Sequence, residues 1–486
     1  MQGSLKNKTT NGVLWSFIDL MSNHGIQFII QIILARLLLP EHFGVIGMVL
    51  VFISISHIII DSGFSTALIR ESDPSPKDYS TVFYCNLVVA LVIYFLLYKS
   101  AFFISSFFNE PLLVPLLRVL SLVLIINSLG IVHKVILTRN VRFRTQTKIS
   151  IISGLLSGII AIIFAFNGYG VWSLVIKTIA MQFFQLVLLW VYIKWIPVYS
   201  FSITSFKRLF GFSSKTLLSS LIGTFYNNIY YVVIGRFYSV ADLGYYTNAY
   251  NLSNVFSNTL TASIQRVTYP VLSSIKEDEE KLKRNFRIVI RMSVFIVFPI
   301  MLGLVVIGTP LINLLFGEKW LPMVIYLQLI CLAGLFHPLY AINSNILQVK
   351  GKADIYLLLE VTNRLIMTLL IVLALWFKTG MQVLIGTAVL YSIITFYTSA
   401  FFSAREISYP IKDQLRDIGP ILIASLLMGS VVYMCGRVLP GSGLFELIFQ
   451  ICIGVIVYVL ICKIMRIKEF DISLQLILSF FNKGNN

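Results

Sequence analysis

The chain has 486 residues, of which 57% are hydrophobic and only 12% are charged. A soluble domain carries about 25% charged residues, so this composition excludes a soluble multidomain enzyme and indicates an integral membrane protein. The net charge of +17 would suit a nucleic-acid binder only if Lys and Arg clustered in a water-exposed motif. They follow the predicted membrane topology instead, so we expect no nucleic-acid partner.

Apolar runs recur along the chain from Val13 to Cys462. Each is long enough to cross a hydrocarbon core of roughly 30 Å. The first run contains Asp19 and no small-residue cleavage site, so we expect it to stay as a span rather than be removed as a signal peptide. The sequence predicts an all-α fold of about fourteen transmembrane helices, near residues 13–35, 43–69, 79–98, 112–133, 149–167, 170–193, 211–235, 245–272, 288–308, 322–346, 354–376, 381–402, 418–435 and 445–462.

The Lys and Arg residues orient these spans. With both termini placed in the cytoplasm, cations in and beside the inner segments outnumber those of the outer loops by about four to one, as the positive-inside rule requires. The basic runs HKVILTRNVRFRTQTK and KEDEEKLKRNFR then face the inner leaflet. Each cation near anionic lipid there is stabilised by about 1 kcal/mol, so we expect anionic inner-leaflet lipids as partners.

A repeat divides the chain. ARLLLPEHFG at 35–44 and GRFYSVADLG at 235–244 are offset by 200 residues. Four pairs match in register: Ala35 with Gly235, Arg36 with Arg236, Phe43 with Leu243 and Gly44 with Gly244. The repeat predicts two six-helix lobes, 1–200 and 201–410, followed by two C-terminal helices and an amphipathic cytoplasmic tail in 411–486. Because six is even, the repeat is parallel, and transporters built in this way hold substrate between the lobes.

Polar residues form stripes on the first two spans. Asp19, Asn23, Gln27 and Gln31 follow a strict four-residue spacing, so they share one helix face. Two readings of this stripe remain open, hydrogen bonding between helices and the wall of a substrate cavity. His57 and Asp61 lie on one face of the second span. An ionisable group inside a membrane is a functional candidate by default, so Asp61, His57 and Asp19 are candidates for a coupling ion or proton.

Deep cations mark the remaining candidates. Arg364 lies near the middle of its span, with Glu360 one turn earlier, so either a substrate contact or a local ion pair explains it. Glu360 is therefore also a coupling candidate. The other expected cavity residues are Arg266, Lys215, Asn227, Asn228 and Lys177. An excess of cations suits an anionic substrate, and the planar donor fork of Arg favours phosphate or pyrophosphate.

Catalytic and cofactor motifs are missing from the sequence. The segment GFSSKT at 211–216 lacks the second glycine of a phosphate-binding loop, and the five histidines show no metal-ligand spacing. The five cysteines fall singly within predicted spans and suit packing. We therefore expect a transporter without a cofactor or metal, and not an enzyme.

Several segments resemble the polysaccharide flippases of the multidrug/oligosaccharidyl-lipid/polysaccharide exporter superfamily, in particular its lipopolysaccharide and teichuronic-acid exporter branch. The resemblance spans nearly the whole chain. It rests on ARLLLPEHFGVIGM, DSGFSTALI, FFNEPLLVPLLRVLSL, YNNIYYVVIGRFYSVADLGYYTNA, QRVTYPVLSSI and LLFGEKW. It implies two six-helix lobes forming a V, alternating access, and basic cavity residues that receive a pyrophosphate. The QR of QRVTYPVLSSI carries that last expectation onto Arg266, and YNNIYY places Asn227 and Asn228 on the first helix of the second lobe.

The resemblance implies that the chain exports an undecaprenyl-pyrophosphate-linked oligosaccharide across the bacterial cytoplasmic (inner) membrane for surface polysaccharide biosynthesis. The polymerase machinery for the same polysaccharide is a further expected partner. Two alternatives stay open. An ion-coupled multidrug antiporter of the same fold would favour a carboxylate-rich cavity, and a membrane polysaccharide polymerase would need a large outer catalytic loop that the predicted topology lacks.

Overall fold

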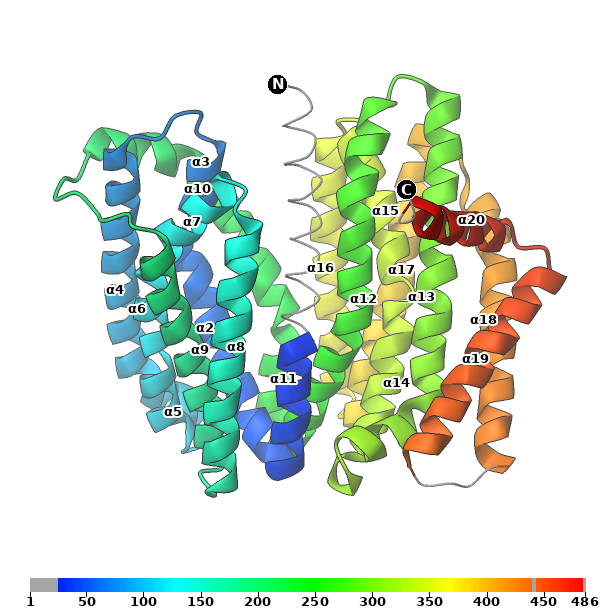
Figure 1. The fold of residues 1–486 in the computed structure, drawn as a ribbon, viewed down its shortest axis with the longest axis horizontal. Helices are drawn as coiled ribbons and strands as arrows, with labels where there is room; N and C mark the ends of the chain where they lie inside the picture. The colour runs from blue at the N-terminus through cyan, green and yellow to red at the C-terminus, as the bar shows by residue number, and fades with distance from the viewer. Residues whose placement is uncertain (1–24, 439–442, 484–486) are drawn as a thin grey trace. The chain divides into compact units, whose positions relative to one another are not determined.

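The computed structural model describes residues 25–438 and 443–483, without the side chains of residues 212, 215, 258–260, 262–264, 266–267 and 476–483. All regular secondary structure within these ranges is helical, which confirms the predicted all-α fold (Figure 1). The helices are α2 (Pro40–Asp61), α3 (Phe64–Arg70), α4 (Pro76–Phe108), α5 (Leu113–Leu120), α6 (Leu122–Ser128), α7 (Ile131–Arg139), α8 (Phe143–Phe166), α9 (Val171–Tyr192), α10 (Ile203–Asn227), α11 (Ile229–Phe237), α12 (Val240–Ser274), α13 (Glu279–Leu315), a 3₁₀ turn (Glu318–Trp320), α14 (Met323–Gly334), α15 (His337–Val349), α16 (Ala353–Trp376), α17 (Met381–Ile407), α18 (Ile411–Val438), α19 (Leu444–Ile464) and α20 (Lys468–Lys483).

Among the described residues, eleven helical segments are long and apolar enough to cross a membrane. A twelfth is the pair Leu113–Ser128 and Ile131–Arg139, which bends by 43°. The first predicted span begins outside the described residues and continues as the shorter apolar helix Gly25–Leu37, and the eighth lies within α12. The structure therefore confirms a multi-pass helical protein, while the count of fourteen spans stays a prediction.

The chain forms two compact units, Met1–Thr247 and Asn248–Asn486. Their boundary falls inside α12, so the first two turns of this helix belong to the first unit together with α10 and α11. We describe each unit by itself. The three-part division at residues 200 and 410 stays a prediction.

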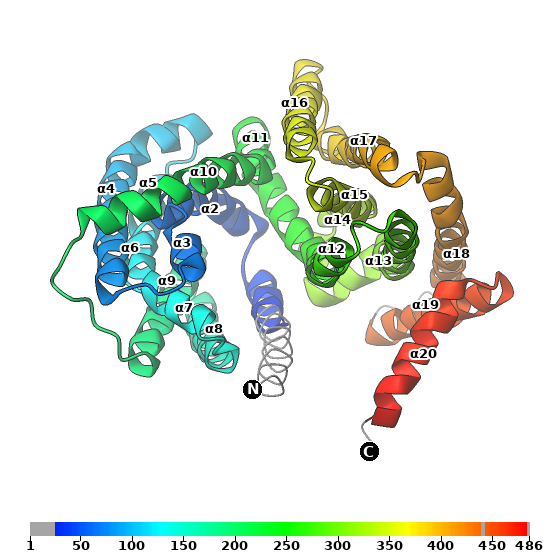
Figure 2. The ribbon, with the colours of Figure 1, turned by 90° about the horizontal axis from the view of Figure 1, so that it is seen from above.

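Helices α8 and α9 form a tight hairpin in the first unit, and α2 packs against α4, α9, α10 and α11 (Figures 1 and 2). The α8–α9 turn contains Gly168 and Gly170, with φ of 79° and 54°. Glycine adopts such positive angles without the steric cost that a Cβ atom brings. The hairpin therefore follows directly from a local sequence signal.

A crossing of two helices in the first unit reproduces the sequence repeat. A Cβ atom added to Gly44 in α2 would overlap the carbonyl oxygen of Val240, and one added to Gly244 in α12 would overlap the carbonyl oxygen of Pro40. Position 240 equals position 40 shifted by the repeat offset, so the two contacts are equivalent. Only glycine allows two helix backbones to approach so closely. The matched glycines are therefore the contact at which the first turns of α2 and α12 cross.

Ion pairs join three helices of the second unit. Arg287 and Arg291 of α13 contact the carboxylate of Asp417 in α18, the Arg287 Nη2 atom at 2.5 Å and the Arg291 Nη1 atom at 3.7 Å. Tyr409 donates its hydroxyl to the same carboxylate. Burial and this carboxylate raise the pKa of Tyr409, so the phenol stays a donor. Arg291 also pairs with Glu469 at the start of α20, at 2.6 Å from Nε to Oε1. The tail helix is thus attached to the helical bundle through a nearly buried carboxylate.

Candidate functional site

Four of the sequence-predicted site residues cannot be located by their side chains. Asp19 and Asn23 lie outside the described residues, and so do the side chains of Lys215 and Arg266. Their roles stay predictions.

Gln27 packs between helices of the first unit. Its Nε2 atom lies 3.6 Å from the Met181 sulfur in α9, and a Cβ added to Gly154 in α8 would come within 3.1 Å of it. This contact has the geometry of hydrogen bonding and packing between helices, one of the two readings of the stripe. Gln31 follows one turn later and is partly buried. The glutamine stripe of Gly25–Leu37 therefore faces α8 and α9 at least at Gln27.

Lys177 lies on α9 one turn before Met181, so it shares the helix face that meets Gln27. Its side chain is partly buried, and within residues 25–438 and 443–483 it makes no ion pair. An ammonium held in a membrane span without a carboxylate partner is costly, since burial penalises the charge. Lys177 is therefore a cation that an anionic ligand would stabilise.

His57 and Asp61 come together at one end of α2. The Asp61 carboxylate accepts hydrogen bonds from the Ser65 hydroxyl and, at 3.3 Å, from the Ser65 backbone N–H. It thereby joins the end of α2 to the first turn of α3, a structural use that the sequence did not reveal. The His57 ring is exposed, and the two charges that act on it are Lys134 of α7 and Asp61. A histidine on which a cation and a carboxylate act in opposite directions is suited to proton exchange.

Glu360 and Arg364 form the local ion pair that the sequence left open, with 3.4 Å between Arg364 Nη2 and Glu360 Oε2. The other oxygen of Glu360 accepts the hydroxyl of Tyr340 from α15. Both side chains of the pair are about one quarter exposed. The separation of 3.4 Å is longer than is common for charge-assisted pairs. Arg364 is therefore oriented by Glu360, and its side chain is partly exposed.

Asn227 and Asn228 mark the junction of α10 and α11. Asn228 donates its amide to the Thr224 carbonyl at 2.8 Å, which caps the end of α10. Asn227 is exposed beside it. The junction falls within the membrane span Thr216–Phe237. An interruption of the helix at this depth is tolerated only where the freed backbone groups lie next to protein or a water-filled space.

Sequence reasoning missed Lys134 and Tyr340. Lys134 belongs to a basic run that topology alone explains, and Tyr340 carries no signal until α15 is packed beside α16. No group of three or more His, Cys, Asp and Glu residues that would hold a metal occurs in the described part of the chain.

Residues 33–325 match the family model described as "Polysaccharide biosynthesis protein". Among curated proteins, the chain is 27% identical over 354 residues to the teichuronic acid biosynthesis protein TuaB of Bacillus subtilis, covering 72% of this chain and 73% of TuaB. It is 27% identical over 361 residues to the lipopolysaccharide biosynthesis protein WzxC of Escherichia coli, covering 72% of each chain.

Among solved structures, the chain resembles the lipid II flippase MurJ in an inward closed conformation. The TM-score is 0.76 with 20% sequence identity, over 93% of this chain and 98% of that one. This likeness shows the fold. Because the family model covers more than half of the chain, the protein is a member of the polysaccharide biosynthesis protein family, with the fold of the exporter superfamily that its motifs resemble.

Proposed function

We propose that this protein is a flippase that moves an undecaprenyl-pyrophosphate-linked oligosaccharide across the bacterial cytoplasmic membrane for surface polysaccharide biosynthesis. The observation that carries the proposal is the lipid II flippase fold over 93% of the chain, with deep cations on its spans. The sugar and pyrophosphate would cross beside Lys177 and Arg364 while the polyprenyl chain remains in lipid. Both termini would lie in the cytoplasm, and the polymerase machinery would take up the exported product.

The carboxylates favour this function over a multidrug antiporter. Asp61 is engaged with Ser65, and Glu360 is engaged with Tyr340 and Arg364. An antiporter of cationic drugs needs carboxylates free to bind its cargo, whereas an anionic cargo needs free cations. Lys177 supplies such a cation. The proton needed for coupling would exchange at His57, between Lys134 and Asp61.

A deletion strain tests the proposal. We expect mass spectrometry of its membranes to find an accumulated polyprenyl-pyrophosphate oligosaccharide, and we expect unchanged drug sensitivity. Drug hypersensitivity without that lipid would support the antiporter instead.

The glycine crossing would close the outer end of the pathway and separate when that end opens. A Cβ placed on Gly47 would lie 3.0 Å from the Thr247 hydroxyl oxygen, which is bonded to the Thr247 Cβ. Cysteines at both positions would therefore face each other at close range, as a disulfide requires. In a chain whose five native cysteines are replaced, we expect oxidised Gly47→Cys/Thr247→Cys protein to lose transport and regain it on reduction.

The two single-cysteine variants serve as controls and should transport under both conditions. Full transport by a quantitatively crosslinked protein would show that the crossing stays closed throughout the cycle.

A further inference from the structure

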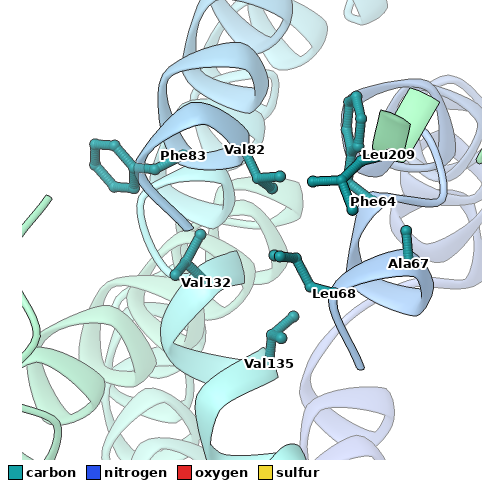
Figure 3. Close-up of a cluster of buried hydrophobic side chains, with 8 residues drawn as sticks. All are labelled: Phe64, Ala67, Leu68, Val82, Phe83, Val132, Val135 and Leu209. Atoms are coloured by element: carbon teal, nitrogen blue, oxygen red, sulfur yellow. The ribbon is translucent and has the colours of Figure 1, made fainter. Parts of the chain in front are cut away.

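A buried apolar cluster holds four helices together at one end of the first unit. Its buried members come from α3, α4, α7 and α10 (Figure 3): Phe64, Ala67, Leu68, Val82, Phe83, Val132, Val135 and Leu209. The Phe64 ring also lies 5.9 Å from the Phe206 ring and 6.1 Å from the Phe210 ring. The first half of α10 is therefore fixed against α3, ahead of the part of α10 that begins the membrane span at Thr216.

Beside this cluster is a polar cavity of about 240 Å³, lined by Ala67, Arg70, Glu71, Ser72, Arg208 and Leu209. Arg208 reaches the Asp78 carboxylate at 2.8 Å and the Glu71 carboxylate at 3.3 Å, and its side chain is 51% exposed. The two carboxylates hold the guanidinium at the cavity and leave part of it facing water.

Arg139 donates hydrogen bonds to backbone carbonyl groups whose partial negative charge would otherwise repel an anion here. It donates to the carbonyls of Leu68 at 2.9 Å, Glu71 at 2.6 Å and Ser72 at 2.6 Å. These carbonyls form the negative end of the α3 dipole and the turn after it. Around the cavity, the guanidiniums of Arg70, Arg139 and Arg208 thus balance the carboxylates of Glu71, Asp73 and Asp78. The exposed Lys207, one residue before Arg208, makes the balance positive.

The linker between α9 and α10 presents apolar side chains outward next to this site. Tyr199 is 100% exposed, Ile196 is 73% exposed, and Phe201 and the first residue of α10, Ile203, are more than half exposed. The linker backbone is nonetheless pinned, because Val198 N–H donates to Ser80 at 2.8 Å and Ser202 N–H donates to Thr81 at 3.1 Å. Both acceptors belong to the first turns of α4, which also carry Asp78. The apolar side chains therefore stand out from a fixed backbone.

We propose that this cavity binds the phosphate group of an anionic membrane phospholipid, with the linker side chains inserted at the boundary between headgroups and acyl chains. Apolar side chains beside exposed cations are the pattern by which proteins bind an anionic membrane surface. Lys194 and Lys207, both exposed, flank the apolar residues and strengthen this charge complementarity. Arg70 and Arg208 would donate to the phosphate, and Ser72 would add a hydroxyl. The cavity is lined by residues of α3, the turn after it and α10, whereas the proposed cargo contacts Lys177 of α9 and Arg364 of α16.

Lipid binding to the full-length chain in nanodiscs tests the proposal. We expect native mass spectrometry to retain phosphatidylglycerol in preference to phosphatidylcholine, and Arg70→Gln/Ser72→Ala to weaken that retention about tenfold or more, as loss of a charge-assisted contact would. Arg118→Gln is the matched control, because Arg118 is a cation of α5 that lies over the ring of Tyr98, in the second half of α4. It should leave retention unchanged.

A second measurement does not depend on the cavity variants. A fluorophore attached at Tyr199→Cys, in a chain without its native cysteines, should be quenched by nitroxide groups carried near the lipid headgroup. Equal retention of both phospholipids, or absence of quenching, would overturn the proposal. So would retention of a polyprenyl pyrophosphate alone, because the cavity would then be a docking site for the carried lipid. Transport is measured separately, so equal retention of both phospholipids or absence of quenching would leave the flippase proposal standing.

Discussion

Alanine at Gly44 or Gly244 is expected to destabilise the protein by about 3 kcal/mol, the upper end of the usual cost of overpacking, and to abolish transport. The new methyl group would meet a backbone carbonyl, the Val240 oxygen in one case and the Pro40 oxygen in the other. A side chain could rotate away, but a carbonyl inside a helix cannot. The first turns of α2 and α12 would have to separate. Thermal unfolding in detergent and a transport assay would measure the two effects.

Gly303→Ala is the matched control for that experiment. Gly303 lies inside α13, and nothing lies within 4 Å of a Cβ atom added there. Alanine should be neutral or slightly stabilising at this position, because it is the better helix former. Wild-type stability in the Gly44 and Gly244 variants would show that the two helices do not touch at these residues.

Arg364→Gln is expected to lower transport at least a hundredfold while leaving the amount of folded protein unchanged. Removing a charge-assisted contact to phosphate in a dry site costs about 3 kcal/mol, which corresponds to a factor of that size. The fold should tolerate the change, because Glu360 retains its hydrogen bond from Tyr340. Transport by purified protein in vesicles and its melting temperature would be measured together.

A charge swap separates the two roles of Arg364. Glu360→Arg/Arg364→Glu keeps an ion pair one helical turn long but moves the guanidinium to the other position. We expect this variant to fold and to remain inactive. Recovery of transport in the swapped protein would mean that the pair is structural and that the cargo does not contact Arg364.

The helical fold and the repeat could be read from the sequence because they depend on local signals. Apolar runs mark the spans, and Gly44 and Gly244 repeat at a fixed offset. The sequence does not say that these glycines touch, since the contact joins helices 200 residues apart. In the same way, the spacing of Glu360 and Arg364 allowed an ion pair as one of two readings, but the third partner Tyr340 depends on how α15 packs beside α16.

Polar residues gave a weaker prediction of the site, because one pattern serves two physical roles. Asp61 resembled a free membrane carboxylate, and it binds the Ser65 hydroxyl and N–H at the start of α3. Lys134 resembled a loop cation, and it lies close enough to act on His57. Which role a polar side chain takes depends on its neighbours in space, and these come from distant segments of the chain.

Reconstitution tests the central claim most directly. Purified protein would be placed in vesicles that carry a polyprenyl-pyrophosphate oligosaccharide, and a glycosidase added outside would report how much of the lipid becomes accessible. If the protein is a flippase, nearly all of the lipid should be cleaved in vesicles that contain the wild-type protein. In vesicles with Arg364→Gln, or without protein, only the lipid in the initially exposed leaflet should be cleaved. Cleavage that stops at the exposed leaflet with folded wild-type protein, under an imposed proton gradient or membrane potential, would contradict the claim.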